Sequence, residues 1–183
     1  MPKVSEAHRE ERRRQILAGA RRAFARHGYE GATVPRLEEE TGLSRGAIFS
    51  YYPSKLELFL ALAESDQQAL GRLWIGEGFD AVVRQIGESP DWIGAYLEVP
   101  RMLRADPSLF ERWQGFNPEL QQQLAAWLEA QQESGAVRSD LGVESIGRFL
   151  GVVLDGLAVQ QGAGAPIDIE GTLELMRSAL APK

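Results

Sequence analysis

The segment Thr33–Lys55 constrains the fold most, because it carries the start and stop signals of two short helices separated by a tight turn. It reads TVPRLEEETGLSRGAIFSYYPSK. Thr33 can cap the first helix, Gly42 can adopt the left-handed conformation that ends it, and Ser44 can cap the second. Two helices joined by such a turn form the helix-turn-helix arrangement, whose second helix enters the major groove of DNA. The segment therefore predicts a DNA-binding unit.

The second helix, expected to run to about Tyr52, has a polar face formed by Arg45, Gly46 and Ser50, with Phe49 beside them. Arg45 can bridge the two acceptors of guanine, Ser50 can donate or accept a hydrogen bond, and Gly46 lets the backbone approach DNA closely. Each residue alone could equally be an exposed side chain on a small helical bundle. Together with the caps and the turn glycine, they predict a surface that reads bases.

Residues on both flanks of this face suit phosphate contacts. Tyr51 and Lys55 follow it, and Lys55 joins the free N–H groups of a helix that begins at Ser54. Thr33 can hold a phosphate on the opposite flank. The predicted DNA-binding residues are Thr33, Ser44, Arg45, Gly46, Ser50, Tyr51 and Lys55.

The net charge of −6 looks unfavourable for DNA binding until it is divided along the chain. Residues 1–55 carry eleven Lys or Arg against seven Asp or Glu, a net charge of +4. Residues 56–183 carry nine against nineteen, a net charge of −10. A basic N-terminal part on an acidic remainder indicates that only the N-terminal part meets phosphates, although an ordinary helical protein can also have uneven charge.

Composition excludes several other classes of function. The chain has no cysteine and only two histidines, His8 and His27, so we expect no metal site, no cofactor and no enzymatic activity. No apolar run approaches the ~20 residues of a membrane span, and the charged start differs from a signal peptide. We therefore expect a cytoplasmic protein with no membrane partner.

Helical spacing of apolar residues, with no convincing strand alternation, predicts an all-α chain of about nine helices. We expect a three-helix DNA-binding domain at 10–53, with its helix-turn-helix motif at 33–52. The remainder, 54–183, is expected to be a helical domain for effector binding and dimerisation. Beyond the motif, the expected helices span 54–74, 79–87, 90–105 with a kink at Pro100, a segment from 107, 119–133, 143–160 and 168–180.

The N-terminal part resembles the DNA-binding region of TetR-family transcriptional regulators. The resemblance covers about residues 10–70 and rests on Phe24 through Tyr29, Gly31-Ala32-Thr33-Val34, GLSRGAIF at 42–49, Tyr52 and Ser54-Lys55. It implies an all-helical homodimer that binds a palindromic operator as a repressor and is released by a small effector. Two positions depart from the usual pattern: position 49 is often Tyr and here is Phe, and position 51 is often His and here is Tyr.

Within the family, RLEEETGLSRGAIFSYYPSKLELFLALAESD together with LEVPRMLRADP is similar to the actinobacterial aconitase repressor group. This similarity implies a citrate-type carboxylate effector accompanied by a metal ion. The sequence does not identify the carboxylate that would hold the metal, since Gly147 and Gly151 stand on the relevant helix.

The expected helix at 143–160 contains three glycines among large apolar residues, which favours close packing against another helix. With the last helix, it would form a four-helix interface across a two-fold axis. The alternative is that both helices belong to the core of one subunit. The predicted interface residues are Phe149, Val153, Leu157, Leu173 and Met176.

An effector pocket is predicted from aromatic residues and two arginines in the C-terminal part. Arg101 and Arg104 lie three residues apart and could grip a carboxylate or phosphate, or pair with Glu98 or Asp106 at the surface. The aromatic residues could equally be plain core. The predicted pocket residues are Trp74, Trp92, Tyr96, Arg101, Arg104 and Trp113.

The sequence thus predicts a dimeric DNA-binding repressor released by a small effector, either a carboxylate or an aromatic or lipophilic molecule. A helical adaptor that binds only protein is the alternative, but it leaves the polar face at 44–55 unexplained. A helical enzyme would need a clustered acid, base or nucleophile that the chain does not offer.

Overall fold

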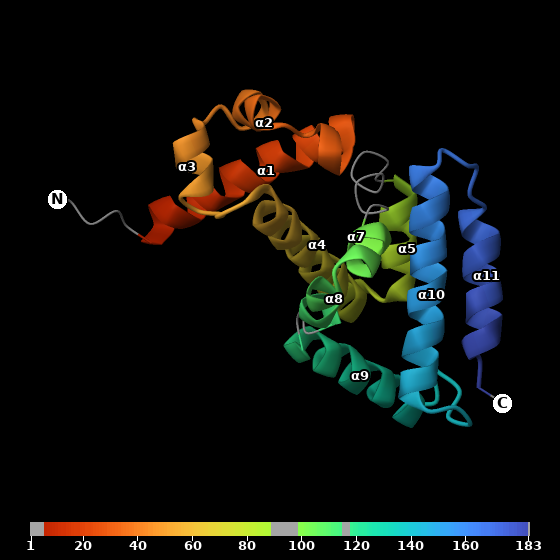
Figure 1. The fold of residues 1–183 in the computed structure, drawn as a ribbon. Coiled ribbons are helices and arrows are strands. Elements are labelled where there is room, and N and C mark those ends of the chain that lie inside the picture. The colour runs from red at the N-terminus through yellow and green to blue at the C-terminus, as the bar shows by residue number, and fades with distance from the viewer. Residues whose placement is uncertain (1–5, 89–98, 115–117, 183) are drawn as a thin grey trace.

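The chain is helical throughout the part that the computed structural model describes, residues 6–88, 99–114 and 118–182 (Figure 1). No strand occurs in these ranges, which confirms the predicted all-α class. The described helices are α1 (Glu6–Gly31), α2 (Val34–Thr41), α3 (Arg45–Phe49), α4 (Lys55–Glu77), α5 (Phe79–Glu88), α7 (Val99–Ala105), α8 (Pro107–Gln114), α9 (Pro118–Glu133), α10 (Val143–Gly162) and α11 (Ile169–Leu180).

The helix boundaries follow the predicted signals with a few differences. Gly28, expected to end the first helix, has φ 66° and interrupts α1, which resumes for a short stretch to Gly31. The second helix of the motif is shorter than expected and ends at Phe49, because the backbone turns from Ser50 onward. The helix expected at 90–105 is described only as α7, and residues 89–98 lie outside the described ranges.

The N-terminal helices share a hydrophobic core, here called the head cluster. Three rings at its centre stack edge to face: Phe24 and Tyr29 lie 5.2 and 5.1 Å from Phe59, measured between ring centroids. The buried residues of the head cluster are Ile16, Ala20, Ala23, Phe24, Ala32, Leu37, Ile48, Leu58, Phe59 and Leu62.

Close contact between α1 and α2 stabilises the head. Gly19 lies so near α2 that a Cβ added to it would stand 2.6 Å from the Cα of Thr41. At the side of this contact, the carboxylate of Glu40 accepts hydrogen bonds from Arg22 Nε at 3.0 Å and Arg26 at 2.5 Å. The glycine and the ion pairs together fix α2 against α1.

Helix α4 connects the head to the rest of the molecule without a break. Its first turns contribute Leu58 and Leu62 to the head cluster, whereas Trp74 near its end belongs to a second cluster. Ser54 caps the start of α4 by accepting a hydrogen bond from the N–H of Glu57 at 3.1 Å. Because α4 is a continuous helix, a displacement of one of its ends also moves the other.

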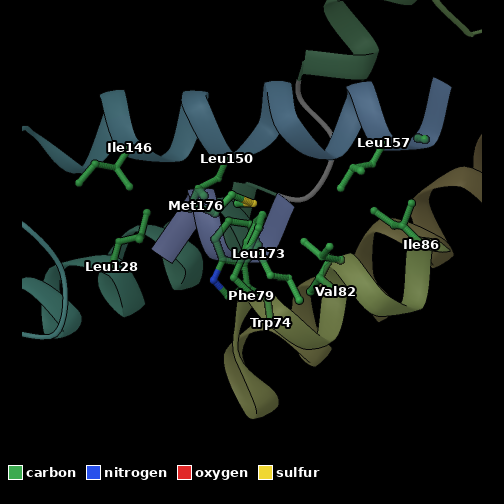
Figure 2. Close-up of a cluster of buried hydrophobic side chains, with 12 residues drawn as sticks. Trp74, Phe79, Val82, Ile86, Leu128, Ile146, Leu150, Leu157, Leu173 and Met176 are labelled. Atoms are coloured by element: carbon green, nitrogen blue, oxygen red, sulfur yellow. The ribbon is translucent and has the colours of Figure 1, made fainter. Parts of the chain in front are cut away.

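The second cluster, here called the body cluster, lies among α4, α5, α9, α10 and α11 (Figures 1 and 2). Helices distant in sequence meet around it, and ion pairs join their outer edges, including a bidentate pair between Arg84 and Glu170. None of the described helices is both long and apolar enough to cross a membrane. The buried residues of the body cluster are Trp74, Phe79, Val82, Val83, Ile86, Leu128, Ile146, Leu150, Leu157, Ala158, Leu173 and Met176.

Helices α7 and α8 return from the body to contact the head. Met102 and Leu103 of α7 pack against the head cluster. Arg112 of α8 donates two hydrogen bonds of 3.0 Å to the carboxylate of Glu57 in the first turn of α4. The head thus contacts the body through α7 and α8 as well as through α4.

Candidate DNA-binding surface and ligand cavity

The turn between α2 and α3 is held by backbone and side-chain hydrogen bonds. Gly42 has φ 68° and donates its N–H to the carbonyl of Glu38 at 2.9 Å, which closes the end of α2. The buried hydroxyl of Thr41 donates to the carbonyl of Leu37 at 2.7 Å and accepts from the N–H of Leu43 at 3.2 Å. The path of the chain from α2 into α3 is therefore set by local contacts.

The first turn of α3 is capped by two side chains, only one of which was predicted. The hydroxyl of Ser44 accepts the N–H of Ala47 at 3.4 Å, as the sequence suggested. In addition, Oε1 of Glu38 accepts the N–H of Arg45 at 2.6 Å. This contact joins α2 to α3. The sequence signal for it was an acidic residue one turn before Gly42, which is easily taken for surface charge.

An exposed polar face remains on α3. Arg45, Gly46 and Ser50 are exposed, and no protein atom lies within 4 Å of the position that a Cβ of Gly46 would occupy. The hydroxyl of Ser50 donates to the carbonyl of Ala47 at 2.8 Å, which leaves its lone pairs for a second partner. The placement of Phe49 on this face was wrong: its ring is half-buried and packs against the head cluster.

The flanking residues lie where the sequence placed them, with different local contacts. Thr33 is exposed at the N-cap position of α2, but its side chain makes no capping hydrogen bond. Tyr51 is half-buried and packs against the head cluster. The Lys55 ammonium donates to the carbonyls of Tyr29 at 2.8 Å and Glu30 at 3.4 Å. It also lies 4.4 Å above the ring of Tyr29, so Lys55 attaches the start of α4 to the end of α1.

A cavity of about 630 Å³ opens in the body among α4, α5, α9 and α10. Its wall is mostly apolar, with Leu70, Leu73 and Trp74 from α4 facing Leu124 from α9. Gly71 brings α4 close to α9, because a Cβ added there would stand 2.4 Å from a methyl carbon of Leu120. The polar side chains on the wall are those of Arg21, Asp66, Gln67, Gln85, Gln121 and Asp155.

Three charged groups face this cavity. Arg21 of α1 forms a bidentate ion pair with Asp66 of α4, which ties the head to the cavity wall. Burial raises the pKa of the Asp66 carboxyl, although its hydrogen bonds from Arg21 act in the opposite direction. Asp155 of α10 is accessible at the wall, yet loss of water around it raises the pKa of its carboxyl.

Comparisons with known proteins bear on this arrangement. Residues 16–62 match the sequence profile of the bacterial regulatory proteins of the tetR family. An HTH-type transcriptional repressor of Mycobacterium tuberculosis is 40% identical, over 98% of this chain and 98% of its own. The chain belongs to the TetR family. The HTH-type transcriptional repressor AcnR of Corynebacterium diphtheriae is 39% identical, over 98% of this chain and 97% of its own.

Solved structures of the TetR family share the fold. Salmonella enterica GusR superposes with a TM-score of 0.72 at 21% identity, over 97% of this chain and 98% of its own. A TetR transcription regulator from Haloarcula marismortui gives 0.70 at 20% identity, over 93% and 98% of the two chains. Family membership confirms the predicted class, a helix-turn-helix DNA-binding transcriptional regulator and not an enzyme, and the similarity to AcnR repressors confirms the narrower resemblance.

The cavity of this TetR-family chain differs from the predicted pocket. Of the predicted residues, Trp74 lines it. Arg101 and Arg104 are exposed outside it, and Arg101 pairs with Glu30 of the head at 3.4 Å, so the structure does not bring these two arginines together with Trp74 at this cavity. Trp92 and Tyr96, together with the side chain of Trp113, fall outside the described part of the chain.

The predicted dimer residues divide between the surface and the core. Phe149 is 42% exposed, as an interface residue should be. Leu157, Leu173 and Met176 are buried in the body cluster (Figure 2), and Val153 packs against it, so these four residues contribute to the core of one subunit. Apolar residues surround α10, and the sequence did not show which side faces inward. Two exposed apolar residues of α10, Val152 and Val159, were not singled out from the sequence, and Leu175 of the last helix, which was expected to take part in the interface, is exposed.

Within the described residues, no three His, Asp or Glu side chains are grouped so that they could hold a metal ion. The two candidate sites of this TetR-family regulator are the exposed face of α3 and the cavity behind α4.

Proposed function

We propose that the protein is a homodimeric repressor that binds a palindromic operator through α3 and is released by a small molecule bound in the body cavity. The observation that carries this proposal is the exposed face of Arg45, Gly46 and Ser50 on a helix whose start is fixed by two caps. A reading helix must present its side chains in a fixed orientation to discriminate bases, and this one does so within a family of DNA-binding regulators.

Arg45 is the proposed base-reading residue, because its guanidinium can meet both acceptors of a guanine in the major groove. Ser50 can accept a hydrogen bond beside it, because its own hydrogen is donated to Ala47, and the open space at Gly46 lets DNA approach the backbone. Thr33 and Tyr51 suit phosphates on either flank. Ser44 and Lys55 contribute by holding α3 and α4, with the remaining ammonium hydrogen of Lys55 free for phosphate.

The predicted division at 53 and 54 is retained as a proposal for function, with DNA contacts before it and effector and dimer contacts after it. In packing terms the head extends further, because Leu58, Phe59 and Leu62 of α4 are part of the head cluster. This overlap favours coupling between the two parts, since the same helix lines the cavity at Leu70 and Leu73.

The proposed dimer uses the outer face of α10 and α11. Phe149, Val152 and Val159 follow one another on the outer side of α10, and Leu175 is exposed on α11. An apolar face of this kind on the surface of a soluble subunit favours burial against a second copy. A two-fold dimer would place two copies of α3 on successive half-sites, ~34–36 Å apart along DNA.

The proposed effector occupies the cavity of about 630 Å³. Its mostly apolar wall favours a lipophilic effector over a carboxylate. In addition, a free carboxylate in this cavity would face the carboxylates of Asp66 and Asp155. Movement of α4 on ligand binding would change the distance between the two copies of α3, which lowers affinity for the operator.

The test of the proposal is the Arg45→Ala variant, titrated with the operator obtained by selecting binding sites from random DNA. We expect operator affinity to fall by about 1–3 kcal/mol, with relaxed preference at the contacted base pair. Affinity of the wild-type protein should also fall steeply with salt, because phosphate contacts release counterions.

The matched control is Arg72→Ala, which removes an exposed positive charge from the far part of α4. It should leave operator affinity unchanged. Equal affinity of wild-type and Arg45→Ala proteins would contradict the reading role of α3, and failure of the wild-type protein to select any DNA would favour the protein-binding adaptor.

A further inference from the structure

A buried hydrogen-bond donor on the cavity wall has no partner. The side chain of Trp74 lines the cavity and is 7% exposed, and its indole N–H makes no hydrogen bond. Figure 2 shows Trp74 among the apolar side chains of the body cluster. Buried donors are almost always paired, because an unmade hydrogen bond leaves the cost of removing the donor from water uncompensated. Among the described residues, this nitrogen is the one buried side-chain nitrogen or oxygen in that condition.

The rings that contact Trp74 pack against the indole without supplying an acceptor. Phe79 and Trp127 meet it edge to face, with ring centroids 4.8 and 6.1 Å away. A phenyl ring has no acceptor atom, and an indole nitrogen only donates. Because Nε1 of Trp74 is also closed to water, an acceptor has to arrive with a molecule that enters the cavity. The N–H therefore indicates a ligand that carries a hydrogen-bond acceptor.

The charges on the wall indicate that this acceptor is neutral. Arg21 is the one cationic side chain among the described residues that line the cavity, and two of its nitrogens are engaged by the carboxylate of Asp66. Asp155 adds a second carboxylate to the wall. An anionic ligand would meet two carboxylates and a guanidinium that is already paired. An ammonium group would bring only donors and leave the indole N–H without a partner.

The rest of the wall suits a hydrocarbon body. Leu70, Leu73 and Leu124 line it, and so does Gly151, where a Cβ would meet no neighbouring atom within 4 Å. Covering such a surface favours binding in proportion to the apolar area removed from water. A small polar molecule would leave most of this area uncovered. The cavity therefore favours a mostly apolar ligand with one neutral acceptor.

We propose that the cavity binds a neutral, mostly hydrocarbon molecule whose carbonyl oxygen, as in a ketone or an ester, accepts the indole N–H of Trp74. The inference rests on the proposed function only for its regulatory consequence. Trp74 belongs to α4, whose first turns lie in the head cluster. Because Nε1 is closed to water, the ligand has to displace neighbouring side chains to reach it, and this displacement acts on the helix that carries the head.

The inference is tested with four ligands that share a phenyl ring and a three-carbon chain: propiophenone, propylbenzene, hydrocinnamate and phenylpropylamine. Each is titrated into the isotope-labelled, full-length protein without DNA, and the indole N–H resonances of the four tryptophans are followed by NMR. The resonance that is lost in Trp74→Phe is that of Trp74. Propiophenone should move this proton downfield, as a new hydrogen bond does, and propylbenzene should not. The ketone should also bind at least about tenfold more tightly than either charged ligand.

Trp74→Phe separates the hydrogen bond from simple filling of the cavity, because it removes the N–H and keeps an aromatic ring. The ratio of propiophenone affinity to propylbenzene affinity should fall about three- to tenfold in this variant. The ratio is compared because the two ligands differ in their hydration. The matched control Trp127→Phe changes an indole that does not line the cavity and should leave the ratio unchanged. Thermal melts establish that both variants are folded.

The inference is overturned if propylbenzene moves the Trp74 indole proton as propiophenone does, if Trp74→Phe keeps the wild-type ratio, or if a charged ligand binds as tightly as the ketone. Absence of ketone binding overturns it as well. If Trp74→Phe does not fold, the indole protons of the wild-type protein, assigned through the other three tryptophans, still decide.

Operator binding is measured separately with and without propiophenone. Ketone binding that leaves operator affinity unchanged contradicts the regulatory consequence at α4. Absence of operator binding in every condition contradicts the proposed function and leaves the ligand class standing.

Discussion

The head and body clusters are both all-helical cores, but they are built in different ways. The head packs α1, α2, α3 and the start of α4 around Phe24 and Phe59, with α1 and α2 in direct backbone contact at Gly19. The body packs helices that line a cavity and leave Val152 and Leu175 66% and 73% exposed. A filled core holds a reading surface rigid, whereas an incompletely filled one leaves room for a ligand and a face for a partner.

The difference also lies in how far along the chain the stabilising contacts reach. In the head, Ser44 and Ser54 cap helices through N–H groups three residues away. In the body, Arg84 pairs with Glu170, 86 residues away, and other helices meet over similar separations. The helix starts and the turn of the head are therefore specified by local signals, whereas the arrangement of the body depends on contacts between segments distant in the chain.

The largest expected effect comes from the exposed face of the body. Val152→Glu would bury two carboxylates at the centre of the proposed dimer, one from each copy, without a partner. We expect dissociation to shift by at least about a hundredfold toward monomer, as measured by sedimentation over a range of protein concentrations.

The control for the dimer prediction is Glu129→Gln, a change on α9 away from this face. If the Val152→Glu protein remains dimeric, the outer face of α10 is not the interface. If the wild-type protein is monomeric at micromolar concentration, the exposed apolar residues need another explanation.

A matched pair of glycine substitutions compares the two cores directly. Gly19→Ala places a Cβ 2.6 Å from the Cα of Thr41, and this backbone atom cannot move without displacing α2. Gly71→Ala places a Cβ 2.4 Å from a methyl carbon at the free end of Leu120, which can turn toward the cavity. We expect Gly19→Ala to destabilise the protein by about 1–3 kcal/mol and Gly71→Ala by clearly less.

Chemical denaturation at one fixed protein concentration measures both glycine variants. Helix propensity favours alanine equally at the two positions, so the difference reports packing alone. Equal losses of stability would mean that the body is packed as rigidly as the head.

The same contrast explains what could be predicted from the sequence. The turn at Gly42 and the caps at Ser44 and Ser54 were recognisable because each signal acts within a few residues. The inward side of α10 was not recognisable, because Phe149 faces out and Leu150 faces in while both are large and apolar. Most of the cavity wall was not recognisable. Arg21 and Asp155 both line it, but they come from helices that share this wall only after α1, α4 and α10 have packed.

A smaller effect is expected at the cap that the sequence did not reveal. Glu38→Ala leaves the N–H of Arg45 without its side-chain acceptor and frees the first turn of α3 from α2. We expect operator affinity to fall by about 1 kcal/mol, while Glu38→Gln, which keeps an oxygen at this position, should lose less.

Fluorescence anisotropy with operator and with unrelated DNA measures the effect of Glu38. A cap that orients the reading helix should affect the operator more than unrelated DNA, whose binding depends on phosphates. An equal change for both DNAs would indicate that Glu38 acts through its charge and not through the orientation of α3.

The smallest expected effect is on the pH dependence of stability, and it concerns a residue of the body. Loss of part of its hydration at the cavity wall raises the pKa of the accessible Asp155 carboxyl in the folded protein, so between its unfolded and folded pKa values the folded chain binds more protons than the unfolded one. Its contribution to stability is therefore full below the unfolded pKa and is lost as pH rises through the folded pKa. Asp155→Asn removes this loss. We expect its free energy of unfolding at pH 7 to exceed that of the wild type by less than about 1 kcal/mol, so that it melts at a higher temperature. Below pH 4 the two proteins should melt at closer temperatures. Melting curves across this pH range check the sign, and a variant that melts below wild type at pH 7 would mean that the ionised Asp155 stabilises the folded protein.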